Sequence, residues 1–417
     1  MTQSTPPHVF ATTGVLTRKH VLAWRNAMFV IFAICGLGLA SWVSRVPAVR
    51  DALGASTLEM GVLIFGVALG SIVGLLASSH VVAHFGARRA IAMCLTIGPV
   101  GFVIAGIGAT VGPSSVLVFV GLTIFGAGLS MADVAMNVSG AANERALGRT
   151  IMPIYHAFFS FGTMIGAGLG ALAEFLAVPI VAHITFIAVV MASSALIAVR
   201  SIQSERFVAE GEESTPGDRD SSSWRDRLSI WRDPRTLFIG LIVLGMAFAE
   251  GSANDWLSLA MVDGYGVRND IGALMFGVFV TAMTVGRLGG VVILDRFGRV
   301  PVLRGSAVLA IIGLIMVIFG PTLWVAIVGI VFWGLGSALG FPVGMSAAAD
   351  DPATAAARVS AVATIGYVAF LIGPPLIGAL GEAVGLLNAL LVVLVLVIIA
   401  GIASGAAREP QKSSPIA

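Results

Sequence analysis

Charged residues are scarce in this chain. They make up 11% of its 417 residues, whereas a soluble domain carries about 25%. Apolar residues make up 57%, and the mean hydropathy is +0.98. A chain with so few polar groups cannot cover a folded surface against water, so we expect it to lie in a lipid bilayer. Its net charge of +2 is too small to indicate a nucleic-acid partner.

Cysteine is scarce as well. The two cysteines, Cys35 and Cys94, both lie inside apolar runs, which excludes a disulfide framework and a metal cluster. We expect them to pack as small side chains. No nucleophile is paired with a base, and no metal-ligand pattern occurs, so the sequence predicts no catalytic residue, metal or cofactor. An enzyme is therefore the least favoured class.

Long apolar runs are what the chain has instead. A transmembrane helix needs about 20 mostly apolar residues. The runs lie near 25–48, 57–82, 90–110, 115–141, 152–177, 179–199, 236–262, 269–294, 301–320, 322–348, 355–381 and 384–406. They are too long and too uniform for membrane strands. The sequence predicts an all-α membrane protein with twelve transmembrane helices.

Basic residues in the short connections predict the orientation, because cytoplasmic loops are enriched in Lys and Arg. They follow every second run, namely at Arg88, Arg89, Arg145, Arg149, Arg296, Arg299, Arg304 and Arg358. Both termini are therefore expected in the cytoplasm. Arg45, Arg50 and Arg268 are exceptions, because they fall on the opposite side.

The two halves of the chain resemble each other. Met60–Val67 matches Ile271–Val278, and Phe85-Gly86 before arginines matches Phe297-Gly298. The predicted organisation is a cytoplasmic N-terminus (1–24), a six-helix bundle (25–199), a polar linker (200–235), a second six-helix bundle (236–406) and a cytoplasmic tail (407–417). Two such pseudo-repeats are typical of a transporter that rocks around a site at the membrane midplane.

Two short motifs carry a family resemblance. Gly286-Arg287-Leu288-Gly289-Gly290 is followed by Asp295-Arg296-Phe297-Gly298-Arg299, and this pattern resembles the loop signature of the major facilitator superfamily. The glycines allow two helices to approach closely, and Asp295 can pair with arginines at a helix end. The resemblance implies that Arg287, Asp295, Arg296 and Arg299 act in gating rather than in substrate binding. The N-terminal copy has Ala83 and Ala87 at the expected Asp and Arg positions.

Within that superfamily, the chain is most similar to the fucose:proton symporter branch and to bacterial inner-membrane relatives of the rhizopine-transport membrane protein. Met131–Asn137 is similar to the acid-x-x-x-Asn stretch of the fucose permease, where the acid serves proton and sugar coupling. The resemblance implies a monomer in the bacterial inner membrane with a small-molecule substrate and protons as partners. One departure is that Trp42–Arg45 has no acid where the fucose permease has an aspartate.

Asp133 is the leading candidate for the proton-carrying group. Its four-residue spacing to Asn137 places both on one helix face, and an acid among apolar neighbours costs about 2.5–3.5 kcal/mol on insertion scales. His156, early in the next run, titrates near neutrality and could share the proton. The structural alternative is that Asn137 or His156 holds a buried Asp133 as a contact between helices.

The seventh run supplies candidate substrate contacts. Glu250 lies near mid-span, and Asn254 follows one turn later on the same face. Together with Asn137, these groups and Trp256 are predicted to contact a small polyol or sugar-like solute. The alternative for Trp256 is a packing side chain at a helix break. Arg45 and Asp255 occupy nearly equivalent repeat positions, so we predict that they pair when the outer gate closes.

Three function classes remain. The favoured one is a proton-coupled symporter for a small polar solute such as a sugar, because the candidate residues are hydrophilic. The alternative is a proton-driven exporter of drugs or metabolites, whose pocket would be more apolar and aromatic. A transport-fold sensor without flux is the third, and a long extra cytoplasmic domain would favour it.

Overall fold

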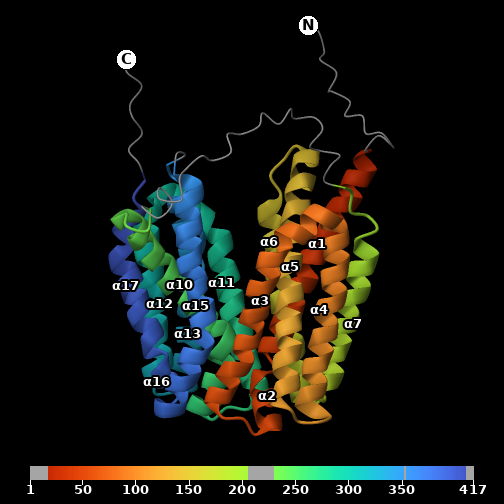
Figure 1. Ribbon diagram of the computed structural model, residues 1–417. Coiled ribbons are helices and arrows are strands. Elements are labelled where there is room, and N and C mark those ends of the chain that lie inside the picture. The colour runs from red at the N-terminus through yellow and green to blue at the C-terminus, as the bar shows by residue number, and fades with distance from the viewer. Residues whose placement is uncertain (1–16, 205–229, 352–353, 410–417) are drawn as a thin grey trace, which may run out of the picture. The chain divides into compact units, whose positions relative to one another are not determined.

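The computed structural model describes residues 17–204, 230–351 and 354–409, which form helices joined by short connections (Figure 1). The helices are α1 (Arg18–Val43), α2 (Val46–Leu53), α3 (Thr57–Phe85), α4 (Ala87–Thr110), α5 (Ser115–Leu147), α6 (Met152–Phe175), α7 (Ile180–Ala198), α10 (Pro234–Tyr265), α11 (Asn269–Phe297), α12 (Arg299–Phe319), α13 (Leu323–Ser337), α14 (Gly340–Ala348), α15 (Ala355–Val384), α16 (Leu386–Ala389) and α17 (Leu391–Ala403), and the 3₁₀ turn η1 (Ser404–Ala407) follows them.

Twelve segments of the described chain are long and apolar enough to cross a membrane. The tenth, Leu323–Ala348, joins α13 and α14, and the twelfth, Leu386–Ala407, joins α16, α17 and η1. No strand occurs in the part of the chain that the structure describes. The predicted all-α fold with twelve membrane helices is confirmed.

The chain divides into two compact units. Unit 1 comprises Met1–Trp42, Gly66–Gly166 and Val178–Arg219, and unit 2 comprises Val43–Phe65, Ala167–Ala177 and Asp220–Ala417. Helix α2 and the last part of α6 therefore belong to the same unit as α10–α17. The predicted bundles 25–199 and 236–406 stay a prediction. Residues 205–229 of the predicted linker, 1–16 of the N-terminus and 410–417 of the tail lie outside the described residues.

The first helix differs from its predicted range of 25–48. It begins at Arg18 and ends at Val43, and the separate helix α2 follows it. The cause is Pro47, which cannot continue a helix because it has no amide hydrogen, but is tolerated in the first turn of a new one. Arg45 thus lies in the turn between α1 and α2, where its φ and ψ are −101° and 0°.

Close helix packing repeats in the two units. In unit 1, a Cβ at Gly121 of α5 would collide with the backbone of Gly101 in α4. In unit 2, a Cβ at Gly329 of α13 would lie 2.7 Å from the carbonyl oxygen of Gly313 in α12. Glycine at these positions lets neighbouring helices approach to backbone contact. The α4–α5 pair of unit 1 and the α12–α13 pair of unit 2 thus pack through glycines in the same way, as the pseudo-repeat predicts.

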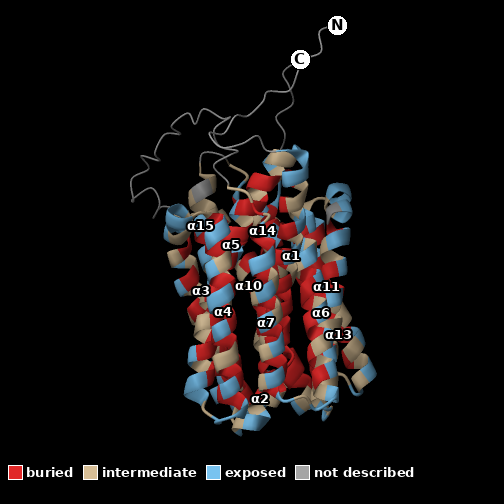
Figure 2. Cartoon of the chain, turned by 90° about the vertical axis from the view of Figure 1, so that its right-hand side faces the viewer, coloured by how far each residue is buried: buried red, intermediate tan, exposed pale blue. Residues whose placement is uncertain are grey.

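Buried and exposed residues alternate along many of the helices (Figure 2), whereas α1 and α10 are mostly buried. Buried polar bonds join three helices of unit 1. The Trp24 indole donates to Ser139 Oγ (2.9 Å), Asn143 donates to the carbonyl oxygen of Val21 (3.1 Å), and the Tyr155 hydroxyl donates to Asn143 Oδ1 (2.6 Å). These bonds fix α1, α5 and α6 against each other, and α5 and α6 carry the first candidate site residues.

Candidate functional site

The Asp133 carboxylate is exposed on a part of α5 whose other residues are buried or half-buried. Asn137 Nδ2 donates to Asp133 Oδ1 (3.3 Å) and to its backbone oxygen (2.8 Å), so the predicted four-residue pair is formed. Ala132, Ala135 and Met136 beside Asp133 are buried, and Asn137 is half-buried. The carboxylate is therefore oriented by one amide of its own helix.

His156 lies near the start of α6 and is exposed. Its ring meets Phe32 of α1 edge-on, with ring centres 5.2 Å apart. Sharing of a proton between His156 and Asp133 stays a prediction. Within residues 17–204, 230–351 and 354–409, no three His, Cys, Asp or Glu side chains gather to hold a metal ion.

Glu250 of α10 and Arg287 of α11 form an ion pair. Arg287 Nη2 donates to both carboxylate oxygens, at 2.9 and 3.0 Å, and the two side chains are 17% and 36% exposed. Arg287 Nε also donates weakly to the carbonyl oxygen of Ala338 (3.4 Å), where α13 ends and α14 begins. The sequence had grouped Arg287 with the gating residues, but the structure places it on a candidate substrate residue.

The rest of the α10 motif behaves differently. Trp256 is fully buried, and a Cβ at Gly378 of α15 would lie 3.3 Å from its indole ring. This packing favours the structural alternative for Trp256. Asn254 and Asp255 are half-buried. Among the described residues, neither side chain has a hydrogen-bonding or ion-pair partner, so both keep polar groups available for a ligand.

A polar network surrounds α2 and lies wholly in unit 2. Arg45 is buried and pairs with Glu174 at the end of α6, with Nη1 to Oε2 at 3.0 Å. Arg50 of α2 pairs with Asp263 of α10 and with Asp51 beside it. Segments that are more than a hundred residues apart in sequence are therefore joined at this end by charge pairs.

Two further contacts extend this network. Asn269, at the start of α11, donates to Asp51 (2.9 Å), and the Glu382 carboxylate of α15 accepts the backbone amides of Thr57 (2.9 Å) and Leu58 (3.3 Å). A carboxylate is favoured at a helix N-terminus because free amides and the helix dipole meet there. The α2-end network is Arg45, Arg50, Asp51, Glu174, Asp263, Asn269 and Glu382.

The structure does not bring Arg45 and Asp255 together. Glu174 takes the predicted place of Asp255, because the repeat relates positions in sequence, whereas a charge pairs with whichever acid faces it. A signal for the network was present in the sequence. Arg45, Arg50 and Arg268 were exceptions to the charge rule, and each has an acidic partner, which for Arg268 is Asp270 at 3.1 Å.

Burial acts differently on the two arginines of the network. Burial lowers the pKa of the Arg45 guanidinium, and Glu174 only partly offsets this effect. Burial also opposes the charge on Arg50, but its hydrogen bonds to Asp263 and Asp51 raise its pKa overall. The surroundings thus stabilise the charged form of Arg45 less well than that of Arg50, and Glu174 is the main group that stabilises the Arg45 charge.

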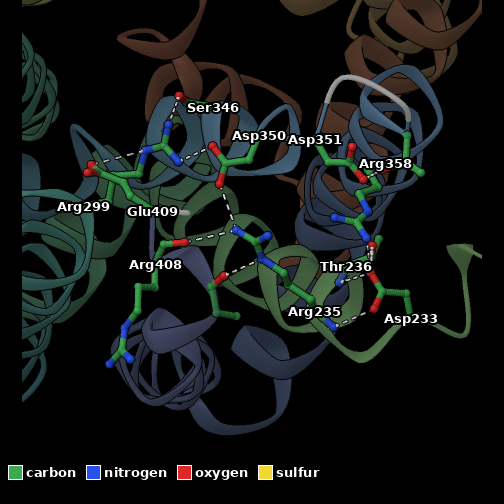
Figure 3. Close-up of polar contacts among 12 residues, drawn as sticks. Asp233, Arg235, Thr236, Arg299, Ser346, Asp350, Asp351, Arg358, Arg408 and Glu409 are labelled. Atoms are coloured by element: carbon green, nitrogen blue, oxygen red, sulfur yellow. Dashed lines mark hydrogen bonds and ion pairs between the residues drawn. The ribbon is translucent and has the colours of Figure 1, made fainter. Parts of the chain in front are cut away.

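A second polar cluster centres on Asp350 (Figure 3). Its carboxylate binds Arg235 at the start of α10 (2.8 Å) and Arg299 at the start of α12 (2.6 Å). Arg299 also donates to Ser346 Oγ (3.0 Å). The Asp350 side chain follows the apolar α14 and is 7% exposed, so two arginines share its single negative charge in a nearly buried place.

The other predicted gating residues lie outside this cluster. Asp295 is exposed and has no ion pair among the residues that the structure describes, and the Arg296 guanidinium lies 5.5 Å from the ring centre of Phe297. Arg299 thus pairs with Asp350, not with the aspartate of its own motif. Sequence reasoning missed Asp350, because nothing local shows which arginines face it.

Replacing Asp350 with alanine is expected to destabilise the protein by about 3 kcal/mol, because Arg235 and Arg299 lose a shared, nearly buried carboxylate. The apparent melting temperature of purified protein in detergent should fall by several degrees. Asp295→Asn, at an exposed carboxylate without an ion pair in the described chain, is the control and should leave the melting temperature within a degree. Equal melting temperatures for the two variants would contradict a stabilising role of the cluster.

Comparison with known proteins places these features in context. The family model described as Major Facilitator Superfamily matches residues 28–289 and 256–416. An uncharacterized MFS-type transporter of Yersinia pestis is 30% identical over 84% of this chain and 87% of its own length. Membrane protein MosC of Rhizobium meliloti is 27% identical over 94% of this chain and 92% of its own length.

Solved structures show the same fold at low sequence identity. A mutant form of the nucleoside transporter NupG matches with a TM-score of 0.74 and 16% identity, covering 94% of this chain and 100% of that one. FucP in its outward conformation matches with a TM-score of 0.60 and 16% identity, covering 94% and 100%. The resemblance drawn from the sequence motifs is confirmed at the level of family and fold.

Proposed function

We propose that this chain couples protons to the movement of a small polar solute across the bacterial inner membrane. The chain belongs to the Major Facilitator Superfamily. Its family and fold are those of transporters, and its twelve membrane-length helices make it a multi-pass membrane protein. In this proposal the transporter is a monomer with both termini in the cytoplasm, and the α2 end faces the opposite side.

The exposed Asp133 carboxylate carries the proposal. It lies within a membrane-length helix, and an ionised acid on such a helix cannot face hydrocarbon without a cost of about 2.5–3.5 kcal/mol. The low-cost place for it is a water-filled path inside the protein. There it takes up a proton on one side and releases it on the other, while Asn137 holds its orientation.

The polar groups of α10 and α11 supply the solute contacts in this scheme. Glu250 and Asn254 lie one turn apart, and Arg287 joins Glu250. The α2-end network acts as a gate, because its ion pairs must break before the α2 end can open. The Asp350 cluster holds the starts of α10 and α12 together during this movement.

The test uses the purified protein in sealed liposomes that contain a pH-sensitive dye. A panel of sugars, hexitols and sugar acids is added outside while an acidic exterior is imposed. The proposal predicts that at least one compound accelerates proton entry, and that the gradient accelerates uptake of the same compound. Uptake of a compound at a rate that ignores the pH gradient would contradict proton coupling.

A further inference from the structure

The Glu250–Arg287 pair is a charge pair far from both ends of its helices. Glu250 lies near the middle of α10 (Pro234–Tyr265), and Arg287 lies ten residues before the end of α11 (Asn269–Phe297). Ion pairs at membrane depth are expensive to form, and those that persist mark binding or ion pathways. We therefore expect the pair to take part in binding or in ion movement, and not only to join two neighbouring helices.

The hydrogen bonds of Arg287 leave part of its guanidinium free. One amino group, Nη2, holds both Glu250 oxygens, and Nε donates to the Ala338 carbonyl oxygen. A guanidinium has five N–H donors, and no partner of Nη1 occurs among the described residues. The side chain is 36% exposed. Arg287 thus presents an open, positively charged edge next to the carboxylate that neutralises it.

The charge of the pair depends on what occupies it. With Glu250 ionised and no ligand, the pair is neutral. When Glu250 takes up a proton, Nη2 is released and the site carries one positive charge. A neutral sugar would leave that charge in a membrane-spanning site, whereas a carboxylate would cancel it. Once Glu250 is protonated, the site becomes neutral again only when it also holds an anion, and an unbalanced charge at membrane depth is costly.

We infer that Arg287 is the binding site for the carboxylate of a small hydroxylated monocarboxylate, which enters together with a proton on Glu250. The ligand carboxylate takes the two-pronged contact with the guanidinium that Glu250 gives up. Asn254, one turn from Glu250 and without a partner among the described residues, donates to a ligand hydroxyl. This inference narrows the solute class and rests on the proposed transport function.

The ionisable groups around Glu250 come from α10 itself and from the helices packed against it. Helices α13, α14, α16 and α17, which pack against α10, contain no ionisable side chain. The ionisable residues on α10 itself and on its other neighbours are Arg235, Asp255, Asp263, Tyr265, Arg50, Asp51, Asp270, Arg287, Asp295, Arg296, Arg358, Tyr367 and Glu382. Of these, Arg287 is the one that forms an ion pair with Glu250 in the described chain.

A purely structural pair predicts different behaviour. If Arg287 only fastens α10 to α11, neutralising Glu250 weakens the fold and creates no affinity. If the inference holds, Glu250→Gln imitates the protonated acid and leaves Arg287 free for an anion. Glu250→Gln should then bind carboxylates without dependence on pH, whereas Arg287→Gln should not bind them at all.

The experiment measures ligand-induced thermal shifts of the detergent-purified full chain at two pH values on either side of neutrality. Probes are matched pairs that differ in one carboxylate, namely glucitol with gluconate, galactose with galacturonate, and propane-1,2-diol with lactate. Variants are Glu250→Gln and Arg287→Gln. Arg304→Gln, which removes an arginine bonded to Ser404 in the same unit, is the matched control.

A carboxylate member should stabilise the wild type and Arg304→Gln, with an affinity that falls by up to about tenfold for each unit of rising pH, because one proton binds with the anion. Its neutral partner should bind at least tenfold more weakly. Preference for neutral members, equal binding of both, or no carboxylate binding by Glu250→Gln would overturn the inference. Proton-driven uptake of a neutral panel member would leave the proposed function standing.

Discussion

Replacing Glu174 with alanine is expected to shift the transporter towards a form in which the α2 end is open. Arg45 is 3% exposed and lies 3.0 Å from Glu174. Removing one member of such a pair costs about 3 kcal/mol or more, because a buried charge loses its counter-charge. That cost falls only on the form that contains the α2-end network, so the ratio of open to closed molecules should rise about 100-fold.

Spin labels on α2 and α15 can measure this shift. Ala52 of α2 and Ala383 of α15 are both exposed in unit 2, and cysteines placed there in a background without Cys35 and Cys94 give one distance distribution. Glu174→Ala should add a longer distance. Arg268→Ala is the matched control, because Arg268 is 71% exposed and its pair with Asp270 should contribute little. A distribution unchanged by Glu174→Ala would remove the network as a gate.

Charge exchange identifies the partner of Arg45. Arg45→Glu alone should open the α2 end, and adding Glu174→Arg should restore the short distance. Adding Asp255→Arg instead should not restore it, since Asp255 has no ion pair among the described residues. If Asp255→Arg restored the short distance and Glu174→Arg did not, the partner of Arg45 would be Asp255, as the sequence repeat alone predicts.

For a neutral solute, whose one proton is carried by Asp133, Asp133→Asn is expected to abolish accumulation driven by a pH gradient while leaving exchange of that solute across the membrane. An amide keeps the size and the contact with Asn137 but cannot carry a proton. For one proton per solute, each pH unit of gradient supplies about 1.4 kcal/mol, or a tenfold accumulation. A gradient of two units should therefore give about 100-fold accumulation in wild type and none in the variant.

The control for this variant neutralises another acid without touching the site. Glu59 and Ser56 bond each other's backbone amides at the start of α3, and glutamine also serves in this capping arrangement. Glu59→Gln should therefore accumulate solute like wild type. If Asp133→Asn lost exchange as completely as accumulation, Asp133 would be a solute or structural group and not the proton carrier.

The helices and their repeat could be predicted because they depend on local sequence. Long apolar runs, the Pro-free interiors of most of them and the paired glycines all act within one helix or between neighbours. The Asp133–Asn137 contact was predictable for the same reason, since a four-residue spacing sets it. The extent of α1 was not, because Pro47 could equally have marked a kink within one helix.

The ion pairs could not be predicted, because each depends on which helix faces are turned towards each other. Glu250 and Arg287 were both recognised as unusual, but assigned to separate roles, since 37 residues separate them in sequence. The polar residues next to Trp256 in the sequence suggest a contact with the solute, but the Trp256 side chain is fully buried. Rotation of a helix about its axis, which tertiary packing sets, decides these cases.

The most direct test measures the steady-state accumulation of a carried neutral compound, a sugar or hexitol of the panel, in liposomes at several imposed pH gradients, with the membrane potential clamped at zero. The account predicts that the logarithm of the accumulation ratio rises linearly with the gradient in wild type, by about tenfold per unit for each proton carried. It also predicts a flat line for Asp133→Asn. A flat line for wild type, or the same slope for both proteins, would contradict proton coupling through Asp133.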